Sequence, residues 1–235
     1  DLADVDGLQR LRMITLHPSY VTKELSEAMA RSPQFMRFLP IPLQSGSDRI
    51  LRAMKRGYDV GLYAKRIDLL RTAMPDLELI SDWIVGFPGE TDEDFQQSKL
   101  RMDEFGFLQS YVFQYSPRPG TTAFDMPDDV EAEVKKQRNI EMLDLQRKIA
   151  RRRSPLWVGK ESTMILEQVA KHQPEHWSGR THNGHPAILP FTEGLVEGAL
   201  VPIKMHGHNG RSLLAQVTGP AFLPLIPTPS EPFCV

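Results

Sequence analysis

The sequence is poor in cysteine, with one among its 235 residues, Cys234, next to the end. One cysteine excludes a disulfide within the chain, and it excludes a metal or iron–sulfur site that takes several cysteines from this chain. Such sparse cysteine fits a reducing compartment. No apolar run is long enough to cross a membrane, and no signal-peptide pattern occurs. The sequence therefore predicts a cytoplasmic protein with no membrane partner.

An excess of either charge is also lacking. The 28 Lys and Arg residues nearly balance the 30 Asp and Glu residues, and the net charge is -2. This balance gives no overall attraction to nucleic acid, so RNA binding must come from local basic patches. We do not expect DNA as a partner.

The chain begins at Asp1 without a methionine, and a strand-like stretch, 11–16, follows almost at once. We expect this beginning to lie inside a longer protein, with a trimmed natural terminus as the alternative. A strand at 11–16 would stand at the edge of its sheet with unpaired backbone groups, which favours aggregation or a partner chain.

Strand-like and helix-like stretches alternate over the first 115 residues. The predicted strands are 11–16, 38–43, 77–85 and 109–115, and the predicted helices are 22–30, a turn or two around 50–54, 60–73 and 91–105. Strands separated by helices predict a parallel sheet of βαβ units, which is an α/β fold. A long charged helix is predicted at 128–153, with Val130, Val134, Leu143, Leu145 and Ile149 as its apolar residues.

The pattern changes after Pro155. Short alternating runs at 161–169, 177–181, 186–189, 200–205 and 213–217 are separated by Gly and Asn turns. They predict a compact all-β barrel of about five strands. The predicted domains are therefore 1–155 and 156–218, followed by a disordered proline-rich tail at 219–235.

The stretch 80–91 carries the clearest local signal. Ile80 to Val85 is typical of a buried strand with Asp82 as its one acid, and the glycines and proline of 86–89 predict a tight loop. Thr91 is a helix cap, and Asp94 suits a capping box. Loops after parallel strands often carry ligands, so this one either binds a ligand or is an ordinary turn.

Polar residues follow several predicted strands, and such strand ends converge on one face of the sheet. They are His17, Gln44, Ser45, Ser47, Asp82, Glu90, Tyr115, Ser116 and Arg118. This set suits a polar ligand with hydroxyls, an amine and a carboxylate, because Gln44 and Ser45 can bond sugar hydroxyls and Arg118 can bind a carboxylate or phosphate. Capping or plain surface polarity is the alternative for each. No Ser-His-Asp or Cys-His set follows from chain order.

Two places could contact RNA. The basic residues at the end of the predicted long helix, among them Arg151, Arg152 and Arg153, either complement the helix C-terminus or bind phosphates. In the β domain, Trp177 and Arg180 could stack on and charge-pair with single-stranded RNA, although Trp177 could equally belong to the barrel core. His206 and His208 lack the further ligands that a metal site needs.

Four long motifs occur in one order. They are LPIPLQSGSDRIL at 39–51, residues 54–58, residues 81–91 and FQYSPRPGT at 113–121. Together they resemble the radical S-adenosylmethionine (SAM) methylthiotransferases, and the resemblance runs over about 11–218. The segment SGRTHNG at 178–184 looks like the small TRAM domain that binds RNA substrate in these enzymes.

The resemblance implies the C-terminal part of a radical-SAM partial TIM barrel, built of parallel βα units, followed by an OB-like TRAM barrel. The SGRT segment and residues 126–130 are more similar to the tRNA-modifying branch. That branch converts N6-isopentenyladenosine at tRNA position 37 to its 2-methylthio form, so it implies tRNA as a partner. A sister branch that modifies a ribosomal protein is the alternative, and a third acts on threonylcarbamoyl-adenosine in tRNA.

The family's chemistry implies SAM and [4Fe–4S] clusters as cofactors. A cluster on a CxxxCxxC motif cleaves SAM, and the resulting deoxyadenosyl radical takes hydrogen from adenosine C2. A second cluster in an N-terminal domain supplies sulfur, and another SAM supplies the methyl group.

This sequence has neither the CxxxCxxC loop nor the N-terminal cluster domain. We therefore expect a fragment that is inactive alone, lacks catalytic residues and metal ligands, and has the missing N-terminal part as its partner. A non-catalytic RNA-binding remnant is a further alternative. By motif, Gln44, Ser45 and Asp82 are the expected SAM contacts, and Tyr115, Ser116 and Arg118 are additional candidates.

Overall fold

The computed structural model describes residues 5–223, and the chain divides into two compact units, Asp1–Arg153 and Ser154–Val235. Cys234 and the predicted tail from residue 224 onward lie outside the described residues. Within the predicted tail, Phe222 exchanges backbone hydrogen bonds with Leu200. No helix among residues 5–223 is long and apolar enough to cross a membrane.

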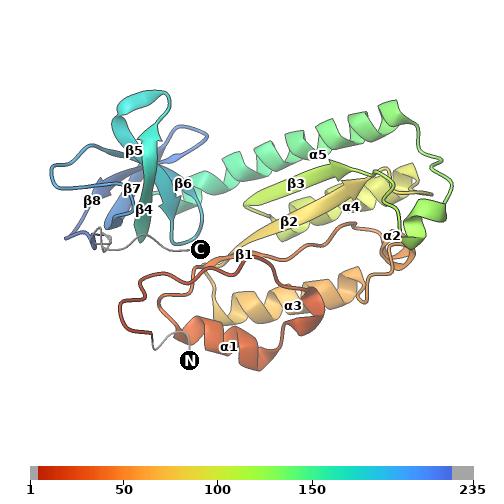
Figure 1. The fold of residues 1–235 in the computed structure, drawn as a ribbon, viewed down its shortest axis with the longest axis horizontal. Coiled ribbons are helices and arrows are strands. Elements are labelled where there is room, and N and C mark those ends of the chain that lie inside the picture. The colour runs from red at the N-terminus through yellow and green to blue at the C-terminus, as the bar shows by residue number, and fades with distance from the viewer. Residues whose placement is uncertain (1–4, 224–235) are drawn as a thin grey trace, which may run out of the picture. The chain divides into compact units, whose positions relative to one another are not determined.

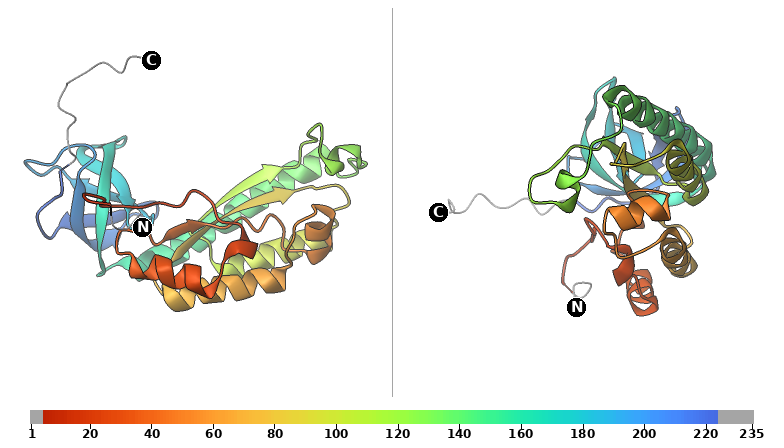
Figure 2. Two further views of the ribbon diagram at one scale, coloured as in Figure 1. Left: turned by 60° about the horizontal axis from the view of Figure 1, so that its bottom comes forward. Right: turned by 90° about the vertical axis from the view of Figure 1, so that its right-hand side faces the viewer.

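The first unit is built on a three-stranded parallel sheet in the order β1-β2-β3 (Figure 1). The strands are β1 (Phe38–Pro40), β2 (Glu78–Val85) and β3 (Gln109–Gln114). The helices are α1 (Lys23–Arg31), α2 (Asp48–Ala53), α3 (Val60–Ala73), α4 (Asp92–Phe105) and α5 (Ala132–Arg153), with 3-10 turns at Pro18–Tyr20 and Thr122–Asp125. Viewed end-on, the longer helices form an arc along one side of the strands (Figure 2). The sequence predicted this α/β arrangement, and the structure confirms it.

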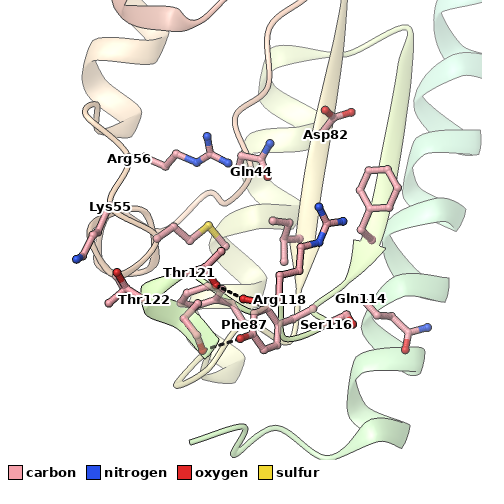
Figure 3. A pocket seen from close by; sticks show the side chains of 16 residues that line it. Gln44, Lys55, Arg56, Asp82, Phe87, Gln114, Ser116, Arg118, Thr121 and Thr122 are labelled. Atoms are coloured by element: carbon pink, nitrogen blue, oxygen red, sulfur yellow. Dashed lines mark hydrogen bonds between the residues drawn. The ribbon is translucent and has the colours of Figure 1, made fainter. Parts of the chain in front are cut away.

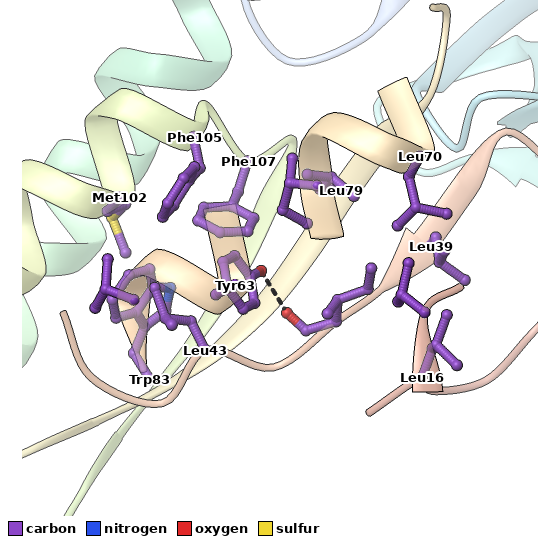
Figure 4. Close-up of a cluster of buried hydrophobic side chains, with 14 of the residues drawn as sticks. Leu16, Leu39, Leu43, Tyr63, Leu70, Leu79, Trp83, Met102, Phe105 and Phe107 are labelled. Carbon is purple, nitrogen blue, oxygen red and sulfur yellow. Dashed lines mark hydrogen bonds between the residues drawn. The ribbon is translucent and has the colours of Figure 1, made fainter. Parts of the chain in front are cut away.

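The helix side of the sheet holds the core of this unit. Because side chains alternate along a strand, Leu79, Trp83 and Val85 of β2 are buried against the helices, together with Phe105 and Phe107 (Figure 4). The Trp83 indole donates to the Ser110 hydroxyl at 3.2 Å, and the buried Tyr63 hydroxyl donates to the Ile41 carbonyl at 2.8 Å. The polar atoms of the core aromatics are therefore paired, as burial requires.

The opposite face of the sheet is largely uncovered. It carries Asp82 and Ile84 of β2, which are half-buried, and Tyr111 and Phe113 of β3, which are 49% and 54% exposed. Tyr111 and Phe113 thus form an exposed apolar surface next to Asp82 and Ile84, with which they pair in register.

The predicted strand at 11–16 is wrong. Leu11 makes one isolated bridge with Phe35, the Leu16 amide bonds the Pro40 carbonyl, and Ile14 is 84% exposed. Pro40 and Pro42 have no amide hydrogen, so the neighbouring segment cannot offer a regular ladder. The same prolines shorten the predicted strand 38–43 to the three residues of β1.

The predicted apolar face of the long helix is also partly wrong. Val134 is 38% exposed, and the buried face of α5 consists of Lys135, Arg138, Met142, Gln146 and Ile149. Hydrogen bonds offset the cost of burying the polar side chains of this face. For example, the Gln146 amide donates to the Phe107 and Leu108 carbonyls at 2.9 and 3.2 Å. Hydropathy alone therefore cannot identify the docking face of α5.

The second unit is a closed barrel of five strands in the order β4-β5-β6-β8-β7. After a 3-10 turn at Ser154–Trp157, the strands are β4 (Glu161–Ala170), β5 (Gln173–Thr181), β6 (Pro186–Pro190), β7 (Leu200–His208) and β8 (Leu213–Val217). Met164, Leu166, Val201, Ile203 and Met205 fill its interior. The predicted five-stranded barrel is confirmed, and closure leaves it without open sheet edges.

Candidate ligand-binding cleft

A cleft of about 560 Å³ opens where the loops after the three parallel strands meet (Figure 3). Its lining comes from the end of α2, from β2 and β3, and from the loop after β3. The residues are Gln44, Ala53, Met54, Lys55, Arg56, Asp82, Ile84, Phe87, Phe113, Gln114, Tyr115, Ser116, Arg118, Thr121, Thr122 and Ala123. Five of the six predicted ligand residues thus lie in one cleft: Gln44, Asp82, Tyr115, Ser116 and Arg118.

Gln44 lines the cleft from a left-handed backbone conformation, with φ of 73°. This conformation is held by two backbone hydrogen bonds to β2, from the Gln44 amide to the Asp82 carbonyl at 2.9 Å and from the Ile84 amide to the Gln44 carbonyl at 3.0 Å. Among the described non-glycine residues, only Gln44 and Lys55 have positive φ, and both line this cleft. Strain of roughly 1 kcal/mol or more per residue is thus concentrated at the cleft, as is common at functional sites.

Asp82 is the one acidic residue that lines the cleft. Its burial raises the pKa of the carboxyl group, and the positive charge of Arg56 opposes this rise. Figure 3 shows the Asp82 carboxylate and the Arg118 guanidinium both directed into the open space. The carboxylate is therefore placed to accept hydrogen bonds from a ligand amine or hydroxyl.

One wall of the cleft is apolar. The rings of Phe87 and Tyr115 meet edge to face at 5.2 Å, and Ile84 and Phe113 extend the surface. The Tyr115 hydroxyl donates to the Ala123 carbonyl at 2.7 Å, so Tyr115 offers its ring rather than its hydroxyl. Such a wall suits a flat aromatic ligand group.

Ser45, the sixth predicted ligand residue, does not line the cleft. It is fully buried, and its hydroxyl lies 3.4 Å from the Ser98 hydroxyl and accepts from the Ser47 amide at 3.2 Å. Next to it, Gly46 sits directly on the backbone of Gln97 and Ser98, where a Cβ would not fit. This contact with α4 turns Ser45 inward, so it shapes the loop rather than touching a ligand.

Asp94 joins the loops that follow β1 and β2. It accepts from the Ser47 hydroxyl at 2.6 Å and from the Thr91 amide at 2.9 Å, and it forms an ion pair with Arg49. The predicted capping box of Thr91 and Asp94 is present. Burial alone would raise the pKa of Asp94, but the hydrogen bonds from Arg49, Ser47 and Thr91 outweigh burial and lower it to about 2.

Glu90 and Arg138 form a buried ion pair behind the cleft. The Glu90 carboxylate accepts from the Gly86 amide at 2.6 Å and from the Arg138 guanidinium at 2.8 Å. Arg138 also donates to the Glu90 carbonyl at 3.1 Å and to Asp92 at 2.6 Å. Burial raises the pKa of Glu90, and the bonds from Gly86 and Arg138 counter part of that rise. The glycine loop that carries Phe87 is thereby fastened to α5.

Lys135 makes the second attachment of α5. Its aliphatic chain occupies the space where a Cβ on Gly86 would stand, and Gly86 has φ of +69°. Its ammonium lies 5.3 Å from the Tyr115 ring centre and forms an ion pair with Asp128. Sequence reasoning missed Lys135 and Arg138, and the spacing of 135, 138, 142, 146 and 149 along one helix face is the signal that could have found them.

The predicted RNA-binding residues fall in both units. On α5, Arg151 is exposed, Arg152 pairs with Asp103 at 2.5 Å and Arg153 pairs with Glu78 at 2.7 Å. On β5, Trp177 contacts Phe191 edge to face at 5.1 Å, and Arg180 donates to the Gly184 carbonyl at 3.1 Å. The ion pairs show that two of the three arginines also have structural roles.

Among residues 5–223, no group of three or more His, Cys, Asp or Glu side chains is placed to hold a metal ion. The sequence contains a single cysteine, so this chain cannot supply a three-cysteine cluster site. The cleft residues fit an organic ligand instead, with an apolar wall for a flat ring, a carboxylate acceptor and a guanidinium donor.

Comparison with known proteins gives several matches. A model of the radical SAM superfamily matches residues 4–101. The chain is 39% identical over 222 residues to the tRNA-2-methylthio-N(6)-dimethylallyladenosine synthase of Thermus thermophilus, covering 93% of this chain and 47% of that protein. It is 41% identical over 219 residues to the protein of the same name from Coxiella burnetii, covering 92% of this chain and 49% of that protein. The chain thus spans about half the length of these relatives.

Among solved structures, coproporphyrinogen III oxidase (HemN) of Escherichia coli, a radical SAM enzyme, matches with a TM-score of 0.46 at 13% identity. The match covers 88% of this chain and 50% of that one, and it is too distant to bear on function.

Asp94→Asn should lower the free energy of unfolding by about 2 kcal/mol at neutral pH, because the folded-state pKa of about 2 lies below the ordinary 3.8. The stabilisation by ionised Asp94 is complete above the unfolded-state pKa and is lost as the pH falls through the folded-state pKa. The free energies of unfolding of the variant and of wild type should therefore converge near pH 2. Urea unfolding, followed by the helical circular-dichroism signal of the α/β unit, measures the difference. The exposed Asp68→Asn is the matched control, and an equal loss there would contradict the role of Asp94.

Arg138→Met should lower the free energy of unfolding by about 3–5 kcal/mol, because it leaves the buried Glu90 carboxylate without its cation. Adding Glu90→Gln should recover part of this loss, since the uncompensated charge is then removed. The same urea measurement reports both variants. Additive effects of the two substitutions would mean that Glu90 and Arg138 are not energetically coupled.

Proposed function

Because the chain belongs to the radical SAM methylthiotransferase family, we propose that its cleft forms part of the SAM site of a tRNA methylthiotransferase. The observation that carries this proposal is the convergence of the strained Gln44, the half-buried Asp82 and the loop of Arg118 on one cleft at the carboxyl ends of parallel strands. Ligands of α/β sheets bind at that edge.

The chemistry of the cleft matches the parts of SAM. The apolar wall of Ile84, Phe87 and Phe113 suits the adenine ring. Gln44 and Asp82 suit the ribose hydroxyls or the amine, and Arg118 suits the carboxylate. Tyr115 contributes its ring to the wall, and Ser116 adds a hydroxyl at the rim. Ser45 supports the loop from behind.

The iron–sulfur cluster that the family implies would supply the electron that cleaves SAM. The residues of this chain do not fit such a cluster, since three cysteine ligands are needed and one cysteine is present. The ligands must therefore come from a further part of the protein, consistent with relatives about twice as long. The uncovered sheet face of Tyr111 and Phe113 is a surface for that part to cover.

For the complete protein we propose methylthiolation of N6-isopentenyladenosine at tRNA position 37, in the cytoplasm. The names of the relatives favour this branch over the ribosomal-protein branch. In the barrel unit, Trp177 and Arg180 are the proposed RNA contacts, because a partly exposed aromatic can stack on an unstacked base and a cation can pair with a phosphate, although Trp177 also packs against the barrel core. On α5, the exposed Arg151 is the best-placed phosphate contact, and Arg152 and Arg153 remain candidates once their ion pairs open.

SAM binding by the 235-residue chain tests the site directly. We expect saturable SAM binding in equilibrium dialysis, weakened roughly tenfold by Asp82→Asn because a charge-assisted hydrogen bond contributes about 1.5 kcal/mol or more. The exposed Asp68→Asn, on α3, is the matched control. Equal affinity of Asp82→Asn and wild type would remove Asp82 from the site.

The chain alone should not turn SAM over. Reconstitution with iron and sulfide under reducing conditions, followed by an assay for cleaved SAM, should give no product, because the cluster ligands are missing. Turnover at a rate proportional to the concentration of the 235-residue chain would refute this expectation.

A further inference from the structure

Helix α5 has an outer face, opposite the buried face that docks on the sheet. Spacings of three and four residues bring five side chains of this outer face into one row, because such positions are neighbours on a helix surface. They are Glu133, Lys136, Ile140, Asp144 and Arg147, and we call them the outer stripe of α5. None of them lines the cleft, so the proposed SAM site gives them no role.

Ile140 stands at the centre of the outer stripe. It is 43% exposed, and the charged members of the stripe lie four and seven residues from it on either side. Their side chains are 48–82% exposed. A single exposed isoleucine is common on a protein surface. This one, however, lies at the midpoint of a row whose charged positions are symmetric about it.

The signs of the charges reverse about Ile140. From the N-terminus to the C-terminus the stripe reads negative, positive, apolar, negative, positive. A second copy that runs antiparallel reads positive, negative, apolar, positive, negative, which is the opposite sign at every charged position. If Ile140 faces Ile140 of the second copy, Glu133 meets its Arg147, and Lys136 meets its Asp144. The stripe is therefore complementary to itself, as a two-fold interface requires.

Two ordinary causes of helix charge patterns do not explain the whole stripe. The helix dipole favours acids in the first turn and bases in the last turn only, whereas Lys136, Asp144 and Arg147 lie outside these turns of α5. Ion pairs within the helix join Glu133 to Lys136 at 3.4 Å and Asp144 to Arg147. These pairs account for the alternating signs, but not for an exposed isoleucine at equal distance from both pairs.

The charged side chains can exchange their partners at small cost. Ion pairs between exposed side chains contribute about 1 kcal/mol or less to stability, so turning toward a second helix sacrifices little. Each charge of the stripe would then face an opposite charge across the interface as well as along its own helix. Charges arranged in this way select one register and one direction of pairing.

We propose that a second copy of this chain docks antiparallel on the outer stripe of α5, with the two-fold axis at Ile140. The two isoleucines form the apolar centre, and four ion pairs around them fix the register. The stripe spans about 21 Å of helix, which is short for a permanent interface. We therefore expect a weak dimer, with a dissociation constant on the order of 10 µM. The contact needs neither SAM nor RNA, so it is independent of the proposed function.

Charge reversal tests this pairing. In sedimentation velocity, the 235-residue chain should pass from monomer to dimer over concentrations that bracket the expected dissociation constant, with a reductant present to exclude a disulfide through Cys234. Glu133→Arg sets arginine against Arg147 of the second copy at both ends of the stripe, and Arg147→Glu sets glutamate against Glu133. Each single variant should therefore weaken dimerisation roughly tenfold or more, because like charges then face each other.

Rescue distinguishes the interface from a simple loss of charge. The double variant Glu133→Arg/Arg147→Glu should dimerise as wild type does, because both members of each pair are then reversed. The two single variants should also associate with each other when mixed, since every facing pair in the mixed dimer has opposite charges. Residues 133 and 147 are about 21 Å apart along the helix, so no contact within one chain could give either result. Asp68→Arg, an exposed reversal on α3, is the matched control and should dimerise like wild type.

Three outcomes would overturn the proposal, once circular dichroism has shown that each variant is folded. A wild-type chain that stays monomeric over the whole concentration range would refute it. A dimer that survives both single reversals would lie elsewhere, for instance on the uncovered sheet face of Tyr111 and Phe113. Single variants that lose the dimer but do not associate when mixed would rule out the antiparallel pairing at Ile140.

Discussion

The carboxylate of Glu90 is buried between the Gly86 amide and the Arg138 guanidinium, and the shape of the cleft depends on this arrangement. A buried carboxylate is costly unless hydrogen bonds surround it, so Arg138 and the loop amide must stay in place together. Lys135 fills the space above Gly86 and contacts the Tyr115 ring. One helix face thus supports two aromatic side chains of the cleft wall, Phe87 and Tyr115.

Charge inside the cleft is distributed unevenly. The one carboxylate, Asp82, lies on the uncovered face of the sheet, whereas Lys55 and Arg56 stand at the end of α2. Left-handed backbone at Gln44 and Lys55 marks the two places where the chain departs from its regular elements to form this lining. The scaffold tolerates this strain because hydrogen bonds hold the flanking loops. Asp94 accepts from Ser47, and the amides of Lys55 and Arg56 donate to the carbonyls of Arg52 and Leu51.

Much of the fold followed from local patterns. The predicted helix 60–73 matches α3, the predicted cap at Thr91 begins α4, and the alternating runs after Pro155 form the barrel strands. These features depend on caps, turn residues and periodicity within a few positions. The strand predicted at 11–16 failed because its neighbour contains prolines that cannot complete a ladder, which the segment itself does not reveal.

The sequence by itself determined the α/β unit, the barrel and five of the residues that line the cleft, because motif order and element periodicity are local properties. Only the tertiary structure shows which of the neighbours Gln44 and Ser45 lines the cleft. A close contact of Gly46 with α4 turns Ser45 into the core, and pairing with β2 turns Gln44 into the cleft. Likewise, α5 docks through Lys135 and Arg138, since hydrogen bonds to distant loops compensate their burial and hydropathy cannot report such partners.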